Sequence, residues 1–259
     1  MLGLPVGVEA YFALRALHER LGRATEEPTR PANIIAISRQ RGAGGRQVAR
    51  LIGGVLGWPV WDKQLLDAMA EVSLGYHSAE AFAKADERVV GAIEAAIASF
   101  FDPSTLETET YLRHLNNAAH KVAESDCITV GRGVHLLLNN HNILRISVGA
   151  SLPVRLANLI RFDRLSDQEA LRKICERDRR LVELHKKIRR KVDGKSPIVD
   201  NNEAEYDCTF TTDRQTVQDV AFCILCMANR RFGLGLSQIQ IERVFTLDLN
   251  WEHHSALTA

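Results

Sequence analysis

The sequence has little net charge, few cysteines and no long apolar run, and each shortage argues against a class of protein. Lys and Arg number 33 against 32 Asp and Glu, so a strongly basic nucleic-acid-binding protein is not expected. The five cysteines are an odd number in a chain of ordinary size, which favours reduced thiols over a disulfide framework. Cys223 and Cys226 have no second ligand pair nearby, so we expect core thiols and no metal site there.

The amino-terminal segment and the apolar stretches give no sign of export or of a membrane span. The first residues lack the basic start and continuous apolar core of a signal peptide. The longest apolar stretches, such as residues 220–228, fall short of the roughly 18 residues that indicate a membrane span. With a hydrophobic share of 46%, the chain is expected to be a folded cytoplasmic protein, with neither membrane nor nucleic acid among its partners.

A glycine-rich turn stands between an apolar segment and an amphipathic one. Residues 33–38 are a short apolar run, typical of a strand buried on both faces of a parallel sheet. Residues 48–56 keep a helical period as far as Gly57, a good carboxyl-terminal stop. Backbone N–H groups of such a turn, together with a helix amino terminus, favour an anion. The order of strand, glycine loop and helix therefore predicts a phosphate-binding site, although a tight turn without a ligand is the alternative.

The loop departs from the standard phosphate-binding motif, which has Lys and then Ser or Thr after its last glycine. Arg46 and Gln47 follow the glycines instead. The Arg46 guanidinium would offer a forked donor to phosphate, but the hydroxyl that usually binds Mg²⁺ is missing, so the metal would need other oxygens. The expected phosphate-binding residues are Ser38, Arg41, Gly42, Ala43, Gly44, Gly45, Arg46 and Gln47.

Further strand patterns alternate with helical ones, which is the signature of an α/β protein with a parallel, doubly wound sheet. Four more strands are predicted, at 59–62, 127–131, 143–148 and 207–211.

Two capping boxes mark helix starts in the second half of the chain. Ser166 is expected to cap a long charged helix that runs towards Lys191, and Thr212 to cap a last helix that ends near Asn229. Three parts follow from these patterns. They are an amphipathic helix and linker at 1–32, a domain at 33–230 that contains a helical insertion, and an extension at 231–259.

Five segments, in the right order, resemble the cytidylate kinase-like family. They are 35–49 (IAISRQRGAGGRQVA), 56–66 (LGWPVWDKQLL), 128–133 (ITVGRG), 148–161 (VGASLPVRLANLIR) and 206–214 (YDCTFTTDR). The resemblance implies a P-loop NTPase-type three-layer fold with a five-stranded parallel sheet, a helical insertion and a mobile lid at about 164–200. It also implies a nucleoside monophosphate kinase-like phosphotransferase that uses ATP and Mg²⁺ and has CMP as the first acceptor to try.

The resemblance also suggests residues that bind the acceptor. Arg132 stands where family members carry Gly-Arg-Asp, although Gly133 replaces the Asp here, and a surface or capping arginine is the alternative. Asp62, after the second strand, would orient the acceptor or a metal-bound water, or would only cap the next helix. Arg155 lies on the arginine-bearing helix after the fourth strand.

In the lid, Asp178, Arg179 and Arg180 match the family's acidic and basic pattern, although charges on a long helix are most often a solvated face. Phosphoryl transfer needs positioning and charge neutralisation more than a protein nucleophile. The catalytic roles are therefore assigned to Arg46, Arg132, Arg179 and Arg180.

Two other functions stay open. The missing lysine and hydroxyl motivate a nucleotide-binding regulatory protein with little turnover, in which the two terminal segments would form partner or homodimer surfaces. A weaker interpretation is a kinase for a small phosphorylated or other non-nucleotide metabolite.

Overall fold

The computed structural model describes residues 30–62, 109–138, 142–193 and 205–247. The chain forms two compact units. One unit, residues 1–31 and 63–124, is described at α6 (Glu109–Val122) and the few residues beside it, so the predicted amino-terminal helix and most of the helical insertion lie outside the described residues. The other unit, residues 32–62 and 125–259, contains the sheet and the site discussed below.

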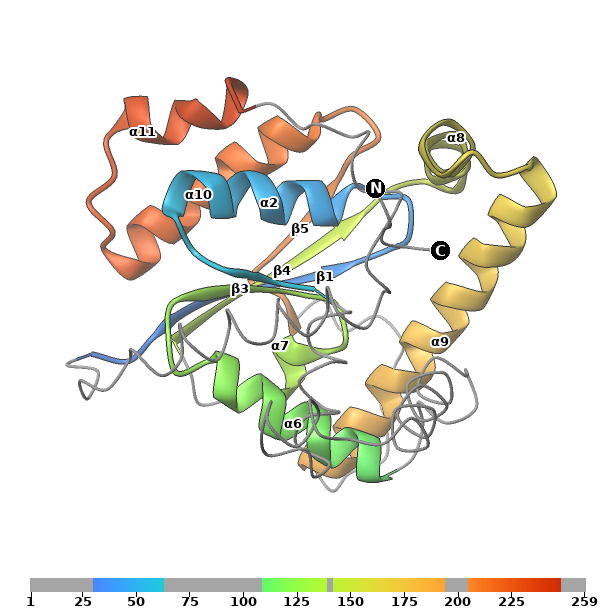
Figure 1. The fold of residues 1–259 in the computed structure, drawn as a ribbon, viewed down its shortest axis with the longest axis horizontal. Coiled ribbons are helices and arrows are strands. Elements are labelled where there is room, and N and C mark those ends of the chain that lie inside the picture. Colours follow the sequence, from blue (N-terminus) through green and yellow to red (C-terminus); the bar gives the residue numbers. More distant parts are fainter. Residues whose placement is uncertain (1–29, 63–108, 139–141, 194–204, 248–259) are drawn as a thin grey trace, which may run out of the picture. The chain divides into compact units, whose positions relative to one another are not determined.

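A five-stranded parallel sheet forms the centre of the second unit (Figure 1). Its strands are β1 (Asn33–Arg39), β2 (Val60–Trp61), β3 (Cys127–Val130), β4 (Asn142–Gly149) and β5 (Cys208–Thr211). Their order is β2-β3-β1-β4-β5, and each neighbouring pair is parallel. All five predicted strands are present, with ends within one residue of those expected. The predicted α/β fold is confirmed.

The strand order fixes where a ligand would bind. β1 lies between β3 and β4. The chain places β2 and β3 on one side of β1 and then crosses to the other side, where it places β4 and β5. In open parallel sheets, the crevice at such a switch point, outside the carboxyl ends of the strands, is where ligands bind. The loop after β1 lies at that point.

Helices cover both faces of the sheet in this unit. On one face, α2 (Gly45–Leu56) and α10 (Val217–Phe232) lie side by side (Figure 1) and enclose a core with alternate residues of the strands, among them Ile35 and Ile37. On the other face, α7 (Val134–Leu137) packs against β1 and against the long α9 (Asp167–Asp193). The helix after β4 is α8 (Leu152–Asp163). Burial on both faces explains why β1 is almost wholly apolar.

The start of α10 differs from the prediction. Thr212 was expected to cap this helix, but Thr216 is its N-cap and forms a capping box with Asp219. Asp219 places a carboxylate in the first turn, where it bonds to the N-cap and favours the helix dipole. The prediction was wrong because two capping patterns follow each other directly in sequence, and Thr212 makes a different bond, described below. The Ser166 cap of α9 is confirmed by its reciprocal bonds with Glu169.

The segment after α10 packs onto the same core. It comprises α11 (Gln238–Glu242) and a 3₁₀ turn, η2 (Arg243–Phe245), whose Ile241 and Val244 are buried against α2 and α10. Cys226 on α10 is exposed, so the prediction of a core thiol is wrong for this residue. No helix in the described ranges is long and apolar enough to cross a membrane.

A cluster of buried polar rings lies on the α7 side of the sheet. His135 of α7 stacks on Tyr206 with ring centroids 4.9 Å apart and meets His185 of α9 edge to face at 5.1 Å. Burial lowers the pKa of His185 to about 4, with a further contribution from the charge of Arg189. Burial, followed by the charge of His185, also lowers the pKa of His135 well below 6.5. Both imidazoles are therefore neutral at pH 7.

This cluster makes the free energy of unfolding depend on pH. In the unfolded chain both histidines titrate near 6.5, so below that pH the unfolded state binds protons that the folded state does not. We expect His185 to lower the free energy of unfolding by up to about 1.4 kcal/mol per pH unit as the pH falls from about 6.5 to 4, and His135 to act in the same direction below pH 6.5, with no effect above pH 7. Urea unfolding of the wild type and of His185→Gln at several pH values measures the difference in slope, and equal slopes would contradict the prediction.

Candidate functional site

The carboxyl edge of the sheet brings together most of the residues that the sequence analysis selected. The glycine loop follows β1, Asp62 follows β2, and the segment with Arg132 follows β3. Thr212, directly after β5, reaches the glycine loop with its side chain. The site is therefore assembled from the ends of strands that are far apart in sequence.

Three side chains from other elements hold three successive carbonyl groups of the loop. Each donates one hydrogen bond from outside the loop, so these carbonyls are directed away from its centre. The bonds run from Arg155 Nε to the Arg41 oxygen (2.7 Å), from Asn158 Nδ2 to the Gly42 oxygen (2.8 Å) and from Thr212 Oγ1 to the Ala43 oxygen (3.1 Å).

The N–H groups at the end of the loop are open. Gly44 is the N-cap of α2 and has a left-handed backbone with no side-chain capping bond. Among the described residues, no acceptor bonds to the N–H groups of Gly44, Gly45, Arg46 or Gln47, and the first bonded amide of the helix is Val48, which donates to the Gly44 carbonyl. Open N–H groups in a row at a helix amino terminus form a cradle for an anion.

Two glycines of the loop are needed for this shape. Gly42 has a φ of +83°, and a Cβ there would lie 2.5 Å from Leu159 Cδ1 and 2.7 Å from the Arg155 carbonyl oxygen. Gly44 has a φ of +77°, and a Cβ there would lie 2.7 Å from Val217 Cγ1. Both positions thus combine a left-handed backbone with a close approach of neighbouring atoms, and only glycine satisfies both conditions.

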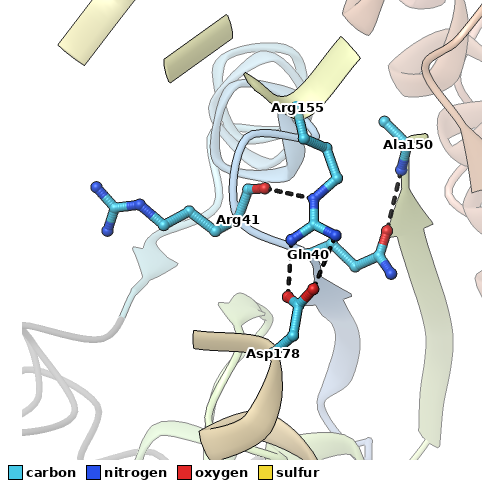
Figure 2. Close-up of polar contacts among 5 residues, drawn as sticks. All are labelled: Gln40, Arg41, Ala150, Arg155 and Asp178. Atoms are coloured by element: carbon cyan, nitrogen blue, oxygen red, sulfur yellow. Dashed lines mark hydrogen bonds and ion pairs between the residues drawn. The ribbon is translucent and has the colours of Figure 1, made fainter. Parts of the chain in front are cut away.

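Arg155 connects the loop to α9 (Figure 2). The side chain is only 4% exposed, and besides its bond to Arg41 it donates from Nη1 (2.9 Å) and Nη2 (2.7 Å) to the two carboxylate oxygens of Asp178. Figure 2 also shows Gln40 accepting a bond from the Ala150 N–H at 3.1 Å. Arg155 therefore positions the loop and the long helix together, and the substrate-binding role expected for it stays a prediction.

Arg46 and Asp62 form an ion pair at this edge of the sheet. The Arg46 Nε lies 3.2 Å from an Asp62 oxygen, without the direction of a hydrogen bond, and the side chains are 24% and 17% exposed. Burial lowers the pKa of nearby Arg50, and the charge of Arg46 lowers it further. Two residues predicted from separate motifs are therefore brought into contact.

Arg39, which the sequence analysis did not select, lies in the same group of charges. Its pKa is lowered to about 9, mainly by burial and then by the charges of Arg46, Arg177 and Arg41, whereas Asp62 opposes them. Arg39 stays charged at pH 7. Its signal in the sequence is an arginine at the end of an otherwise apolar strand, directly before a glycine loop.

Arg132 has an unusual backbone conformation. It is a non-glycine residue with a φ of +59°, between Gly131 at +77° and Gly133 at +68°, and it is only 4% exposed. A left-handed conformation costs a non-glycine residue about 1 kcal/mol, and such strain is often found at functional sites. A Cβ at Gly133 would lie 2.5 Å from Ile188 Cδ1 of α9, so this turn packs directly against the long helix.

Two other predicted binding residues contact the protein itself. Ser38 is buried at the end of β1 and shares a hydrogen bond with Tyr206. The Arg41 side chain lies 2.8 Å from Asp163 in an ion pair at the surface. Their expected phosphate contacts stay predictions.

The lid arginines lie on different sides of α9. Arg179 is exposed, and Arg180 lies 3.9 Å from Glu176, one turn before it. Arg177, which sequence reasoning missed, is the α9 arginine whose charge acts on Arg39. The catalytic roles predicted for Arg179 and Arg180 are untested by these contacts.

The sequence profile of the cytidylate kinase-like family matches residues 34–214, which is well over half of the chain. The chain belongs to this family. The matched region begins with β1 and ends after Thr212, so it contains the glycine loop and all the side chains that hold its carbonyls. None of the curated proteins matches the chain.

Solved structures resemble the chain at low sequence identity. An uncharacterized protein from Eubacterium ventriosum ATCC 27560 is 16% identical, with a TM-score of 0.55, and the match covers 76% of this chain and 98% of that one. Protein TT1252 from Thermus thermophilus is 18% identical (TM-score 0.44, 76% and 98% covered), and shikimate kinase from Acinetobacter baumannii in complex with shikimate is also 18% identical (TM-score 0.38, 81% and 97% covered). The first of these shows that the fold recurs in another protein.

The loop geometry gives a stability prediction with a matched control. Gly42→Ala and Gly57→Ala both place a side chain at a φ near +70° to +80°, but only Gly42 has atoms within 3 Å of the new Cβ, whereas Gly57 has none within 4 Å. We expect Gly57→Ala to lower the free energy of unfolding by about 1 kcal/mol, and Gly42→Ala by a further 1–3 kcal/mol, roughly the cost of overpacking. Urea unfolding measures both, and equal losses would show that the loop is not packed as described.

Proposed function

We propose that the protein is an ATP-dependent phosphotransferase of the cytoplasm that phosphorylates a nucleoside monophosphate, with CMP as the first acceptor to test. The row of open N–H groups from Gly44 to Gln47, at the switch point of the sheet, carries the proposal. Membership of the cytidylate kinase-like family supports the reaction type. CMP as the acceptor rests on the resemblance of the motifs.

The residues of the loop fit the phosphate chain of ATP. A Cβ at Gly42 or Gly44 would meet packed atoms, so glycine at both positions lets the loop keep this backbone shape. The N–H groups of the loop would hold phosphate oxygens, and Arg46 would add charge to that contact. These groups are held by the packed contacts of the loop, so little reorganisation is needed when phosphate binds.

The fit for Mg²⁺ is less complete. Among the described residues, no group of three His, Cys, Asp or Glu side chains forms a metal site, and neither Arg46 nor Gln47, which follow the glycines, has the hydroxyl of the standard motif. Asp62 is the carboxylate at this edge that would hold the metal or one of its waters, in competition with Arg46. Mg²⁺, when bound, would neutralise part of the charge of the phosphates.

In the proposed mechanism, the protein positions the donor and acceptor phosphates and neutralises part of their charge. The loop amides and Arg46 would hold the donor phosphates, and Arg132 at the end of β3 would bind the acceptor phosphate. An oxygen of that acceptor phosphate is itself the nucleophile, so no protein nucleophile is needed. Arg155 would hold the loop and α9 in fixed relative positions through its bonds to the Arg41 carbonyl and to Asp178.

A nucleotide-binding regulatory protein is the second candidate, and two observations favour it. The hydroxyl that usually binds Mg²⁺ is absent after the loop glycines, and Arg46 pairs with Asp62, the carboxylate best placed to replace it. In this case ATP would bind without efficient turnover.

The proposed activity has a direct assay. We expect purified protein with ATP and Mg²⁺ to convert CMP to CDP, with ADP formed in equal amount, as measured by ion-exchange chromatography. UMP, AMP and GMP in parallel reactions define the acceptor. Calorimetry with ATP is run on the same preparation. Tight ATP binding without any phosphorylated acceptor would favour the regulatory candidate over the kinase.

Arg132 can be tested separately from the donor site. Arg132→Asn removes the charge but keeps a residue type that tolerates the left-handed backbone. If Arg132 holds the acceptor phosphate, the KM for the acceptor should rise by about 10- to 100-fold, the scale of a charge-assisted contact, while the KM for ATP changes little. A rise in the KM for ATP alone would remove Arg132 from the acceptor site.

A further inference from the structure

The residue directly after the loop is Gly45, because α2 begins there and Gly44 is its N-cap. In the standard motif, the lysine follows the last loop glycine at the start of the helix. Counted from the observed helix start, the lysine position is therefore occupied by a glycine, and Arg46 lies one residue further along. The structure thus raises the question of which cation replaces the lysine.

The side chain of Arg39 fills the space beside Gly45. A Cβ built on Gly45 would lie 2.7 Å from Arg39 Cβ, 3.1 Å from Arg39 Cδ and 3.5 Å from Arg39 Cγ. The stem of Arg39 therefore runs from the end of β1 over the first residue of α2. The long side chain of Arg39 fits here because Gly45 has no side chain.

The guanidinium of Arg39 has one buried donor without a hydrogen bond to any described residue and lies among other cations. Its Nε is buried and has no hydrogen-bond acceptor among the described residues. The charges of Arg46, Arg177 and Arg41 act on it, and Asp62 is the counter-charge that acts on it in return. A buried, unbonded donor among other cations is unfavourable, and a bound anion would remove this cost.

We propose that Arg39 is the cation that binds the phosphate chain in place of the motif lysine, reaching it from the end of β1 rather than from the helix. The inference rests on the proposed nucleotide site and names a residue within it. It explains why Gly45 carries no side chain and why an arginine ends a strand whose centre is apolar.

The test combines ligand affinity with the stability of the unliganded protein. Arg39→Met keeps the packed stem and removes the charge, and Arg243→Met, at an exposed arginine of η2, removes the same charge elsewhere. We expect Arg39→Met to weaken binding of ATP and of inorganic tripolyphosphate by about 10- to 100-fold in calorimetry, the scale of a hydrogen bond to a charged group. The control should bind as the wild type does, and Arg39→Lys should retain part of the affinity.

The stability of the unliganded protein separates this role from a structural one. Since Arg39 lies among like charges, Arg39→Met should leave the Tm of the unliganded protein unchanged or raise it, while the increase in Tm caused by ATP becomes smaller. A lower Tm of the unliganded variant with wild-type ATP affinity would assign Arg39 a packing role and overturn the proposal.

A transplant of the charge provides a second test. Gly45→Lys alone should lose stability, because its Cβ meets the Arg39 stem. Arg39→Gly combined with Gly45→Lys removes that contact, restores the lysine of the standard motif and should recover affinity relative to Arg39→Gly alone. If the double variant binds no better than Arg39→Gly, the proposed exchange of positions is wrong.

These experiments test the role of Arg39 separately from the proposed function. If the wild type binds ATP and Arg39→Met binds it equally well, the role of Arg39 is overturned and the proposed function stands. Binding of tripolyphosphate but not ATP, lost in Arg39→Met, overturns ATP as the substrate and supports Arg39 as the phosphate ligand. Absence of binding to either probe in the wild type overturns both.

Discussion

The direction of three loop carbonyls is the constraint on which the rest of the site depends. Arg155, Asn158 and Thr212 each donate a hydrogen bond to one of these carbonyls. A peptide whose carbonyl is held on one side presents its N–H on the other. The donors come from α8 and from the turn after β5, so the phosphate cradle requires β4 and β5 beside β1. A local strand-loop-helix segment would not hold this shape alone, because none of the three donors belongs to it.

The same edge of the sheet concentrates positive charge that the protein balances only in part. Arg46 pairs with Asp62, whereas Arg39 is held among Arg46 and Arg177 with its Nε buried and without an acceptor. Folding with this arrangement costs free energy that better-paired charges would not. Such a cost is expected at a site built for an anion, since natural proteins give up stability where function needs an unsatisfied group.

The sequence predicts the sheet well and the site only in part. Strands such as β1 and β3 are recognisable because a covered parallel sheet needs nearly continuous apolar runs, and the glycine loop is recognisable because only glycine suits its backbone. The contacts of Thr212 and Arg39 depend on which strand ends meet in space. In sequence, Thr212 fits a helix cap as well as a residue that bonds to the loop. The contact of Arg39 with Gly45 follows no periodic pattern of residues, so the sequence does not predict it.

Arg155 makes the loop and the long helix parts of one structure. Its Nε holds the loop carbonyl of Arg41, while its other nitrogens hold both oxygens of Asp178 on α9. The guanidinium is rigid and planar, so a movement of α9 that keeps the Asp178 pair must also move the Arg41 carbonyl or break its bond. Since Arg177 is the neighbour of Asp178 in sequence and acts on Arg39, a shift of this helix would change the field at the phosphate cradle as well as its shape. The shape of the loop and the position of α9 are therefore linked through a single buried side chain.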